Sequence, residues 1–98
     1  MRTLFSNAIN ERRTVRVYYD PGWRTVEPHA LGYSKEGHLL LRAFQTEGAS
    51  DSGEHINWKL FRLDRMREAD TSNDSFNDPR PGYKRGDSAM KGGIIAQL

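Results

Sequence analysis

The sequence predicts a single, mainly β domain in which a short N-terminal helix precedes four or five antiparallel strands of a small, partly open barrel. Three observations predict this fold. The chain has 98 residues, which is too short for a second hydrophobic core. Apolar residues recur every three or four positions only near the N-terminus and alternate with polar residues afterwards. Short turns rather than long crossovers separate the apolar stretches, and a barrel leaves few sheet edges open.

The N-terminal helix is expected over residues 3–13. Its apolar residues recur at spacings of three and four, as on one face of a helix: Leu4, Phe5, Ala8 and Ile9. Thr3 is suited to cap the helix N-terminus. Arg12 and Arg13 fall in the last turn, where cations interact favourably with the helix dipole. From residue 14 the apolar period changes to two, which indicates that a strand follows.

Four or five short strands are expected after the helix. They are short apolar or alternating runs bounded by turn-forming residues, over these ranges: 14–19, 23–27, 30–33, 38–44 and 55–63. Pro28 lacks an N–H, so it ends the second strand or lies at an edge or a bulge. Residues 38–44 are the most apolar and are expected to be central in the sheet. Residues 45–54 are rich in glycine, serine and acidic residues, which is typical of a flexible loop.

The chain is expected to divide into a barrel with its helix, residues 1–66, and a tail, residues 67–98. Residues 70–78 are polar without a period, which is typical of disorder. The tail nevertheless contains too many apolar residues for a segment that lies only in solvent: Phe76, Tyr83, Met90, Ile94, Ile95 and Leu98. We therefore expect the tail to be partly packed on the barrel and partly flexible, with a short helix near residues 88–95.

Composition narrows the function classes. The chain has no cysteine, which excludes a disulfide scaffold, a cysteine nucleophile and a zinc knuckle. No apolar run approaches the length of a membrane span and the N-terminus lacks the apolar stretch of a secretory signal, so a cytoplasmic location without a membrane partner is expected. The net charge is only +2, but eleven of the fifteen basic residues are arginines, whose planar fork suits phosphates and carboxylates. The alternative is an ordinary mixed-charge surface.

The sequence contains no arrangement that indicates catalysis. The three histidines, His29, His38 and His55, lie in different predicted strands, and none has a second metal ligand at helical spacing. No nucleophile elbow is present, and the glycines are dispersed in turns rather than gathered in a phosphate-binding loop. We therefore expect a protein that is not an enzyme and that has no metal and no cofactor.

Basic and aromatic residues lie together on the predicted strands, which favours binding of a nucleic acid. Arg42, Lys59, Arg62 and Arg65 lie on or beside the last two strands, and His29 and Tyr33 precede them. Alternate side chains of a strand share a face, so several of these residues can converge. Small barrels bind single strands in this way, with cations on phosphates and rings on bases. The alternative is that the aromatic residues belong to the core and that the arginines only pair with nearby carboxylates.

Several segments, in this order and at this separation, resemble the WYL domain. They are residues 26–31 (VEPHAL), the apolar run at 39–41 and residues 60–66 (LFRLDRM). Residues 8–13, which lead into the strand at 15–19, also match the way in which such domains begin. The resemblance covers about residues 4–66. The signature that gives the family its name reads His38-Leu39-Leu40 here, so its tyrosine is missing.

The resemblance implies an Sm-like or SH3-like five-stranded antiparallel barrel with a ligand-sensing role. WYL domains usually follow a DNA-binding winged helix in bacterial transcription regulators, many of which are linked to DNA damage or phage defence. Their basic surface is thought to receive nucleic acid or nucleotides. Carried over position by position, the candidate ligand contacts in this sequence are His29, Arg62, Arg65, Arg42 and Tyr33.

Two hypotheses for the function follow. In the first, the chain is a regulatory module that binds single-stranded nucleic acid or a nucleotide: Arg62 and Arg65 contact phosphate, His29 donates a hydrogen bond and Tyr33 stacks. Phe61 and Leu63 share the core parity of their strand, which directs Arg62 outward, whereas the direction of Arg65 stays open. In the second, the chain is a protein-interaction module that forms a homodimer or docks on a larger regulatory protein through its sheet edges or its apolar tail.

Overall fold

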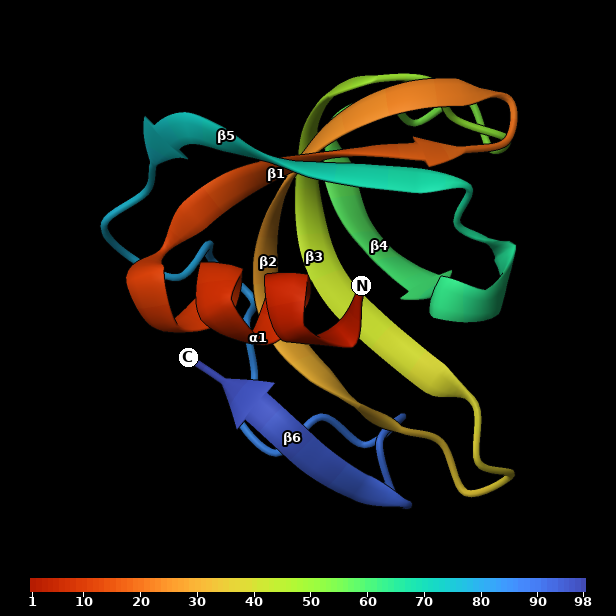
Figure 1. Cartoon of the computed structure of the whole chain (residues 1–98), viewed down its shortest axis with the longest axis vertical. Coiled ribbons are helices and arrows are strands. Elements are labelled where there is room, and N and C mark those ends of the chain that lie inside the picture. Colours follow the sequence, from red (N-terminus) through yellow and green to blue (C-terminus); the bar gives the residue numbers. More distant parts are fainter.

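One antiparallel sheet of six strands, covered on one face by one α-helix, makes up the protein (Figure 1). The structure is a computed structural model that describes all residues 1–98. Its elements in chain order are α1 (Arg2–Glu11), β1 (Arg13–Tyr19), β2 (Gly22–Tyr33), β3 (Leu39–Gly48), β4 (Asn57–Arg62), the 3-10 helix η1 (Leu63–Arg65), β5 (Glu68–Ser75) and β6 (Gly93–Gln97). No helix is long and apolar enough to cross a membrane.

The strand order is β4-β3-β2-β1-β5, and the sixth strand, β6, also pairs with β2. Strand β2 is long enough to have two successive neighbours on one edge. Its first half pairs with β1 and its second half with β6, while β3 follows the other edge. The predicted mainly β, antiparallel fold with a short N-terminal helix is therefore confirmed. The predicted five-stranded, partly open barrel is wrong in two respects: there are six strands, and the sheet is not closed into a barrel because the outermost strands β4 and β5 are not paired.

The main core lies between α1 and the inner face of the sheet. Helix α1 buries Phe5, Ala8 and Ile9, as the helical period of the sequence predicts. They pack against side chains from four strands and η1: Val15, Val17, Val26, Leu31, Leu41, Ala43, Phe61 and Leu63. The helix ends where Arg12 adopts a left-handed conformation with φ of 55°, and the chain then turns directly into β1.

A β-bulge at Pro28 determines which side chains of β2 face outward. The strand continues through Pro28, but the register with β3 shifts between Pro28 and Ala30. Pro28 lies between the segment of β2 that pairs with β1 and the segment that pairs with β6, a place where a missing N–H is tolerated. His29 and Ala30, although consecutive, both contact groups on the face away from α1. An uninterrupted strand would direct these two side chains to opposite faces.

The two strands of the tail were not predicted. Residues 70–78 lack an apolar period, yet residues 68–75 form β5, which pairs with β1 at an outer edge of the sheet. Backbone hydrogen bonds rather than burial hold this strand, so its side chains are free to be polar. The predicted helix near residues 88–95 is wrong. Gly93, with φ of 123°, starts β6 beside β2, and Met90 packs with Ala30 and Leu40 in a second small core on the outer face.

Replacing Gly32 with alanine is expected to loosen β6 from β2. A Cβ at Gly32 would lie 2.6 Å from the Gly93 carbonyl oxygen and 3.0 Å from the Met90 sulfur, so the two strands must separate. We expect a loss of about 1–3 kcal/mol of stability and faster hydrogen exchange of the amides of β6. Gly22→Ala is the control, because its Cβ meets only the Ala49 side chain, at 3.3 Å. Unchanged exchange in β6 would contradict the pairing.

Candidate ligand-binding face

The face of β2, β3 and β4 that points away from α1, here called the outer face, carries most of the predicted binding residues. The register places Phe44 beside Trp58, Arg42 beside Leu60 and Leu40 beside Arg62. Of the residues between them in β3 and β4, Leu41, Ala43 and Phe61 belong to the main core. All six side chains therefore face outward, including that of Arg62, as the strand parity predicts.

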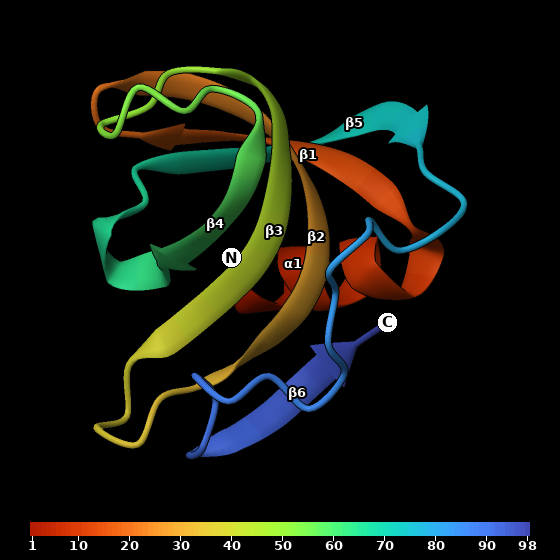
Figure 2. The same cartoon turned by 180° about the vertical axis from the view of Figure 1, so that it is seen from behind.

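The segment that joins β5 to β6, residues 76–92, lies across the outer face and is here called the strap (Figure 2). Phe76 is buried at its start, where its N–H donates to the Arg12 carbonyl, and Met90 is buried near its end. The strap has no regular secondary structure between these anchors. Its position depends on side-chain contacts with the sheet.

His29 is the most enclosed of the predicted binding residues, with 0% of its surface exposed. Its ring stacks on Phe76 at 5.5 Å and meets the edges of Trp58 at 4.7 Å and Tyr83 at 5.1 Å. Nε2 accepts a hydrogen bond from the Arg80 N–H at 3.0 Å, so Nδ1 carries the proton and donates to the Glu27 carbonyl at 2.8 Å. Both ring nitrogens thus bind groups of the protein itself. Burial lowers the pKa of His29 and keeps the ring neutral.

Two bidentate ion pairs connect the strap to the sheet. The Arg80 guanidinium donates to both carboxylate oxygens of Glu27, at 2.7 and 2.9 Å. In the opposite sense, Arg42 of β3 donates to both carboxylate oxygens of Asp87, at 2.7 and 3.3 Å. The hydrogen bonds from Arg42 lower the pKa of the Asp87 carboxyl. The hydrogen bonds from Arg80 to Glu27 raise the pKa of the Arg80 guanidinium. Each ion pair therefore uses a charged side chain of the sheet, Glu27 or Arg42, that could otherwise bind a ligand of opposite charge.

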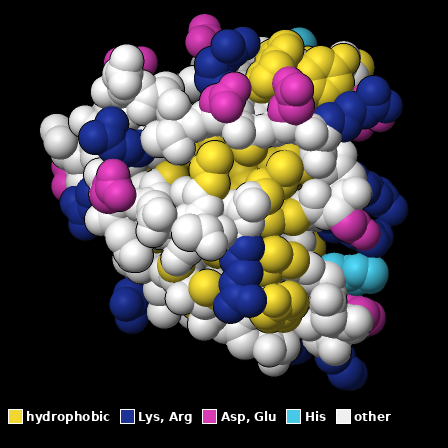
Figure 3. Space-filling view, viewed as in Figure 1, with side chains coloured by type: hydrophobic (Ala, Val, Ile, Leu, Met, Phe, Trp, Pro, Cys, Tyr) yellow, Lys and Arg dark blue, Asp and Glu magenta, His cyan; other side chains and the backbone are white.

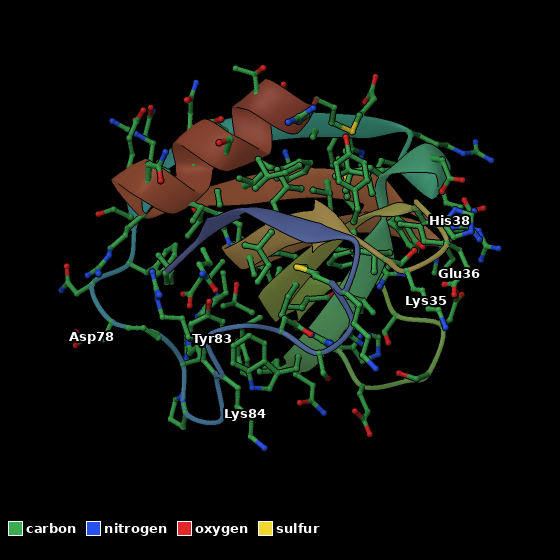
Figure 4. All side chains as sticks on the ribbon, turned by 90° about the horizontal axis from the view of Figure 1, so that it is seen from below. Lys35, Glu36, His38, Asp78, Tyr83 and Lys84 are labelled. Carbon is green, nitrogen blue, oxygen red and sulfur yellow. The ribbon has the colours of Figure 1, made fainter.

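A hollow of about 420 Å³ opens between the strap and strands β3 and β4. It is lined by Arg42, Trp58, Gly82, Tyr83, Lys84, Arg85, Gly86, Asp87 and Ser88. Three of these side chains are cationic and one is anionic, and the two rings stack at 6.1 Å with 24° between their planes. Figure 4 shows Tyr83 directed toward the sheet and Lys84 directed into solvent. This hollow, here called the strap hollow, combines positive charge with aromatic surface.

Arg62 and Arg65 lie at the far end of β4 and are separate from the strap hollow. Arg62 donates to both oxygens of Asp64, at 3.1 and 2.6 Å, and its Nη2 lies 3.2 Å from Nδ1 of His38. The hydrogen bonds from Arg62 lower the pKa of the Asp64 carboxyl. Arg65 is exposed on η1 and lines another hollow, of about 520 Å³, together with Tyr19, Asp20, Asp51, Asp64, Met66 and Arg67. The sequence left the direction of Arg65 open. In the structure Arg65 lines this second hollow, which also contains three aspartates.

Tyr33 lies on the opposite side of the sheet from Arg42. Its neighbour Gly32 pairs with the outward residue Leu40, so the Tyr33 side chain faces the side of α1. There its hydroxyl accepts a hydrogen bond from Arg2 at 3.3 Å, and the Arg2 guanidinium lies 5.9 Å from the ring centroid. The structure therefore does not bring Tyr33 together with the other four predicted residues.

The face that carries α1 offers no continuous basic surface. Figure 3 shows that Lys and Arg side chains on this face are scattered, most of them near its rim and one over its middle, and are interspersed with Asp and Glu, while hydrophobic side chains form a band through the middle. The strap hollow and the β4 end of the outer face are therefore the better candidates for an anionic ligand.

A family model of the WYL domain matches residues 2–71. The chain belongs to the WYL domain family. No curated protein and no solved structure matches it. WYL domains are in general regulatory, ligand-sensing domains. The match ends within β5, so the strap and β6 of this WYL domain lie outside the matched residues.

Most of the residues that surround the strap hollow of this WYL domain were missed by sequence reasoning. They come from the strap: Tyr83, Lys84, Arg85 and Asp87. The one signal was the density of basic and aromatic residues around two prolines at 79–85, in a tail that otherwise has a polar composition. The sequence left open whether the aromatic residues near the basic ones belong to the core or to a binding surface, and Trp58, which is one of them, is half-buried beside the hollow.

The buried, neutral state of His29 makes stability depend on pH. In the unfolded chain His29 titrates near its ordinary pKa of about 6.5, whereas burial lowers the pKa in the folded chain. Below about pH 6.5 the unfolded state therefore binds more protons, and stability falls as pH decreases by at most about 1.4 kcal/mol per pH unit. The Asp87 carboxyl, whose pKa is lowered, acts in a separate window, because its contribution is present above about pH 3.9 and is lost below it.

Urea unfolding at about pH 7.5 and about pH 5.5 measures this dependence. We expect His29→Gln to be less stable than wild type at about pH 7.5. We also expect its stability to differ much less between the two pH values than that of wild type. The control is His55→Gln, which changes an exposed histidine and should keep the wild-type difference. Equal pH dependence in wild type and His29→Gln would show that another group is responsible.

Proposed function

We propose that this WYL domain is a non-catalytic regulatory module that binds single-stranded nucleic acid or a nucleotide on its outer face. The observation that carries the proposal is the strap hollow, which is lined by Arg42, Lys84 and Arg85 together with the ring of Trp58. Cations in a groove hold phosphates, and an aromatic ring provides a stacking surface for a base without requiring one sequence. This combination favours a ligand that carries both a phosphate and a base.

The outward side chains of β4 extend the proposed site beyond the hollow. Trp58, Leu60 and Arg62 follow one another at every second position, about 7 Å apart along the strand. Leu60 is 41% exposed although it is apolar, so a base or sugar can cover it. Arg62, and Arg65 beyond it, would then hold phosphates at the far end. A short single-stranded oligonucleotide lying along β4 would contact this whole row, whereas a nucleotide would occupy the strap hollow alone.

The carboxylates on this surface limit the affinity of the proposed site. Asp87 and Asp64 already bind the forks of Arg42 and Arg62, so a phosphate has to compete with them. Lys84 and Arg85 have no carboxylate partner. In this proposal His29 supports the Trp58 ring as a positioning residue, because its own ring nitrogens are occupied.

We also propose that the sheet is an opened variant of the Sm-like or SH3-like barrel that the family resemblance implies. In support, α1 precedes five antiparallel strands, and the fifth returns beside the first. The gap between β4 and β5 leaves the outward row of β4 at a sheet edge. An edge strand with exposed side chains is accessible to a ligand along its whole length.

Binding of a short, labelled single-stranded oligonucleotide by the full chain, measured by fluorescence anisotropy at low and moderate salt, tests the proposal. We expect affinity to fall steeply with salt, because phosphate contacts release counterions. Lys84→Gln and Arg85→Gln should each weaken binding and reduce the salt slope by about one. Lys35→Gln, which removes an exposed cation in the turn between β2 and β3, is the control and should change neither quantity. Absence of binding at low salt would exclude this ligand class.

Arg62→Ala is expected to weaken oligonucleotide binding by about tenfold or more, with little change in the melting temperature. Arg62 is partly exposed and its only ion pair, with Asp64, is at the surface, so its removal affects folding little. Anisotropy and thermal unfolding of the same variant separate the two effects. If Arg62→Ala unfolds the domain instead, the arginine is structural and does not belong to the site.

A further inference from the structure

Residues 79–83 of the strap, Pro79-Arg80-Pro81-Gly82-Tyr83, occupy a groove in the sheet and are here called the Pro-Arg-Pro segment. The groove is formed by four side chains of the outer face: Glu27, His29, Phe44 and Trp58. The segment is neither helix nor strand. Its contacts resemble those of a peptide bound to a receptor, since each is made to a different side chain of the sheet.

The arginine of the segment is recognised by charge, by geometry and by an aromatic ring. Glu27 is only 6% exposed on a face that otherwise carries cations, and Arg80 is its one ion-pair partner. Both oxygens of Glu27 accept from the guanidinium, and the guanidinium carbon lies 4.7 Å from the centroid of the Phe44 ring. A lysine cannot reproduce this fork, so the pocket is specific for arginine.

The backbone of the segment is recognised at two places, one at Arg80 and one at Pro81. The N–H of Arg80 donates to Nε2 of His29 at 3.0 Å, and the carbonyl of Pro81 accepts from the indole N–H of Trp58 at 3.1 Å. Prolines at 79 and 81 fix φ on either side of the arginine, which reduces the conformational entropy that binding removes. Aromatic grooves that bind extended proline-containing peptides combine the same elements.

We infer that this groove is a recognition site for an extended peptide in which an arginine is flanked by prolines, and that a partner protein carrying such a segment binds there in place of the strap. The Arg80 side chain is 40% exposed, and residues 77–79 and 81–82 lie at the surface. Phe76 and Met90, which are buried, anchor the strap on either side of the segment. The Pro-Arg-Pro segment can therefore leave while both anchors stay in place.

The segment of the chain itself competes with the partner. A tethered segment acts at an effective concentration of about millimolar, so a free peptide binds the wild-type groove weakly. Removing the Arg80 side chain weakens this competition and leaves the groove intact. The groove and the proposed nucleic-acid site share Trp58, but Glu27 and Phe44 do not line the strap hollow, so a change at Glu27 tests the groove separately.

Titration of the full chain with a fluorescent peptide of residues 77–86 (NDPRPGYKRG) tests the inference. We expect the Arg80→Ala chain to bind the peptide at least about tenfold more tightly than wild type. Glu27→Gln in the Arg80→Ala background should abolish this gain, and a peptide with lysine in place of its arginine should bind at least about tenfold more weakly. Lys91→Ala is the control. It removes an exposed cation of the strap outside the Pro-Arg-Pro segment and should behave as wild type.

Two results would overturn the inference. One is an Arg80→Ala chain with a wild-type NMR spectrum of its core that binds the peptide no better than wild type. The other is an Arg80→Ala chain that binds the peptide equally well with and without Glu27→Gln. If Arg80→Ala does not fold, Arg80→Lys serves instead, because it keeps the charge and loses the fork. Oligonucleotide binding, measured in parallel, should not respond to Glu27→Gln, so failure of this inference and failure of the proposed function are distinguishable.

Discussion

Replacing Arg42 with glutamine is expected to reduce both ligand binding and stability, and a second substitution separates the two effects. Arg42 lines the strap hollow and neutralises Asp87, whose side chain is largely buried. Without Arg42 the Asp87 carboxylate loses its partner, which is expected to cost about 1–3 kcal/mol of stability. A nucleotide or oligonucleotide loses its deepest phosphate contact, so affinity should fall by about tenfold or more.

The double variant Arg42→Gln with Asp87→Asn removes both charges. We expect it to recover most of the stability, because no unpaired charge stays buried, and to recover none of the binding. Asp87→Asn alone should bind the ligand more tightly than wild type, because the phosphate no longer competes with a carboxylate. Urea unfolding and anisotropy on the same four proteins complete the cycle. Recovery of binding in the double variant would show that Arg42 acts only through the strap.

Phe61→Ala is expected to have the largest effect on folding, a loss of about 3–5 kcal/mol. Phe61 is 1% exposed in the main core, and its ring meets Tyr19 at 4.9 Å and lies under the Arg24 guanidinium at 5.5 Å. The substitution removes apolar surface from the core and leaves a cavity beside a buried cation. Urea unfolding of Phe61→Leu, which keeps most of the volume, provides the comparison and should show a clearly smaller loss.

The first half of the fold could be predicted because its side chains alternate between core and solvent. The period of three and four residues located α1, the period of two located β1, and short apolar or alternating runs bounded by turns located β3 and β4. Strand β5 could not be found in this way. It lies at an outer edge, where backbone pairing with β1 holds it, and it places few side chains in the core. The Gly92-Gly93 pair, whose second residue starts β6, is a signal against a helix at this place.

The candidate site was predicted only where it depends on local strand parity. Arg62 faces outward because Phe61 and Leu63 face the core, and this relation extends over three consecutive residues. The surroundings of His29 instead depend on Phe76, Arg80 and Tyr83, which lie about fifty residues further along the chain. The position of Tyr33 depends on the bulge at Pro28, which shifts the parity of β2. Neither a distant contact nor a register shift leaves a period in the sequence.

The central claim is that an anionic ligand with a base binds between the strap and β4. Chemical-shift mapping of the full, ¹⁵N-labelled chain with a single-stranded oligonucleotide or a nucleotide at low salt tests it most directly. The account predicts that the largest shifts occur at the Trp58 indole N–H, the Arg42 side chain and the amides of residues 82–88, and that with an oligonucleotide they extend to Leu60 and Arg62. Shifts confined to α1 and β5, or no shifts at all, would contradict it.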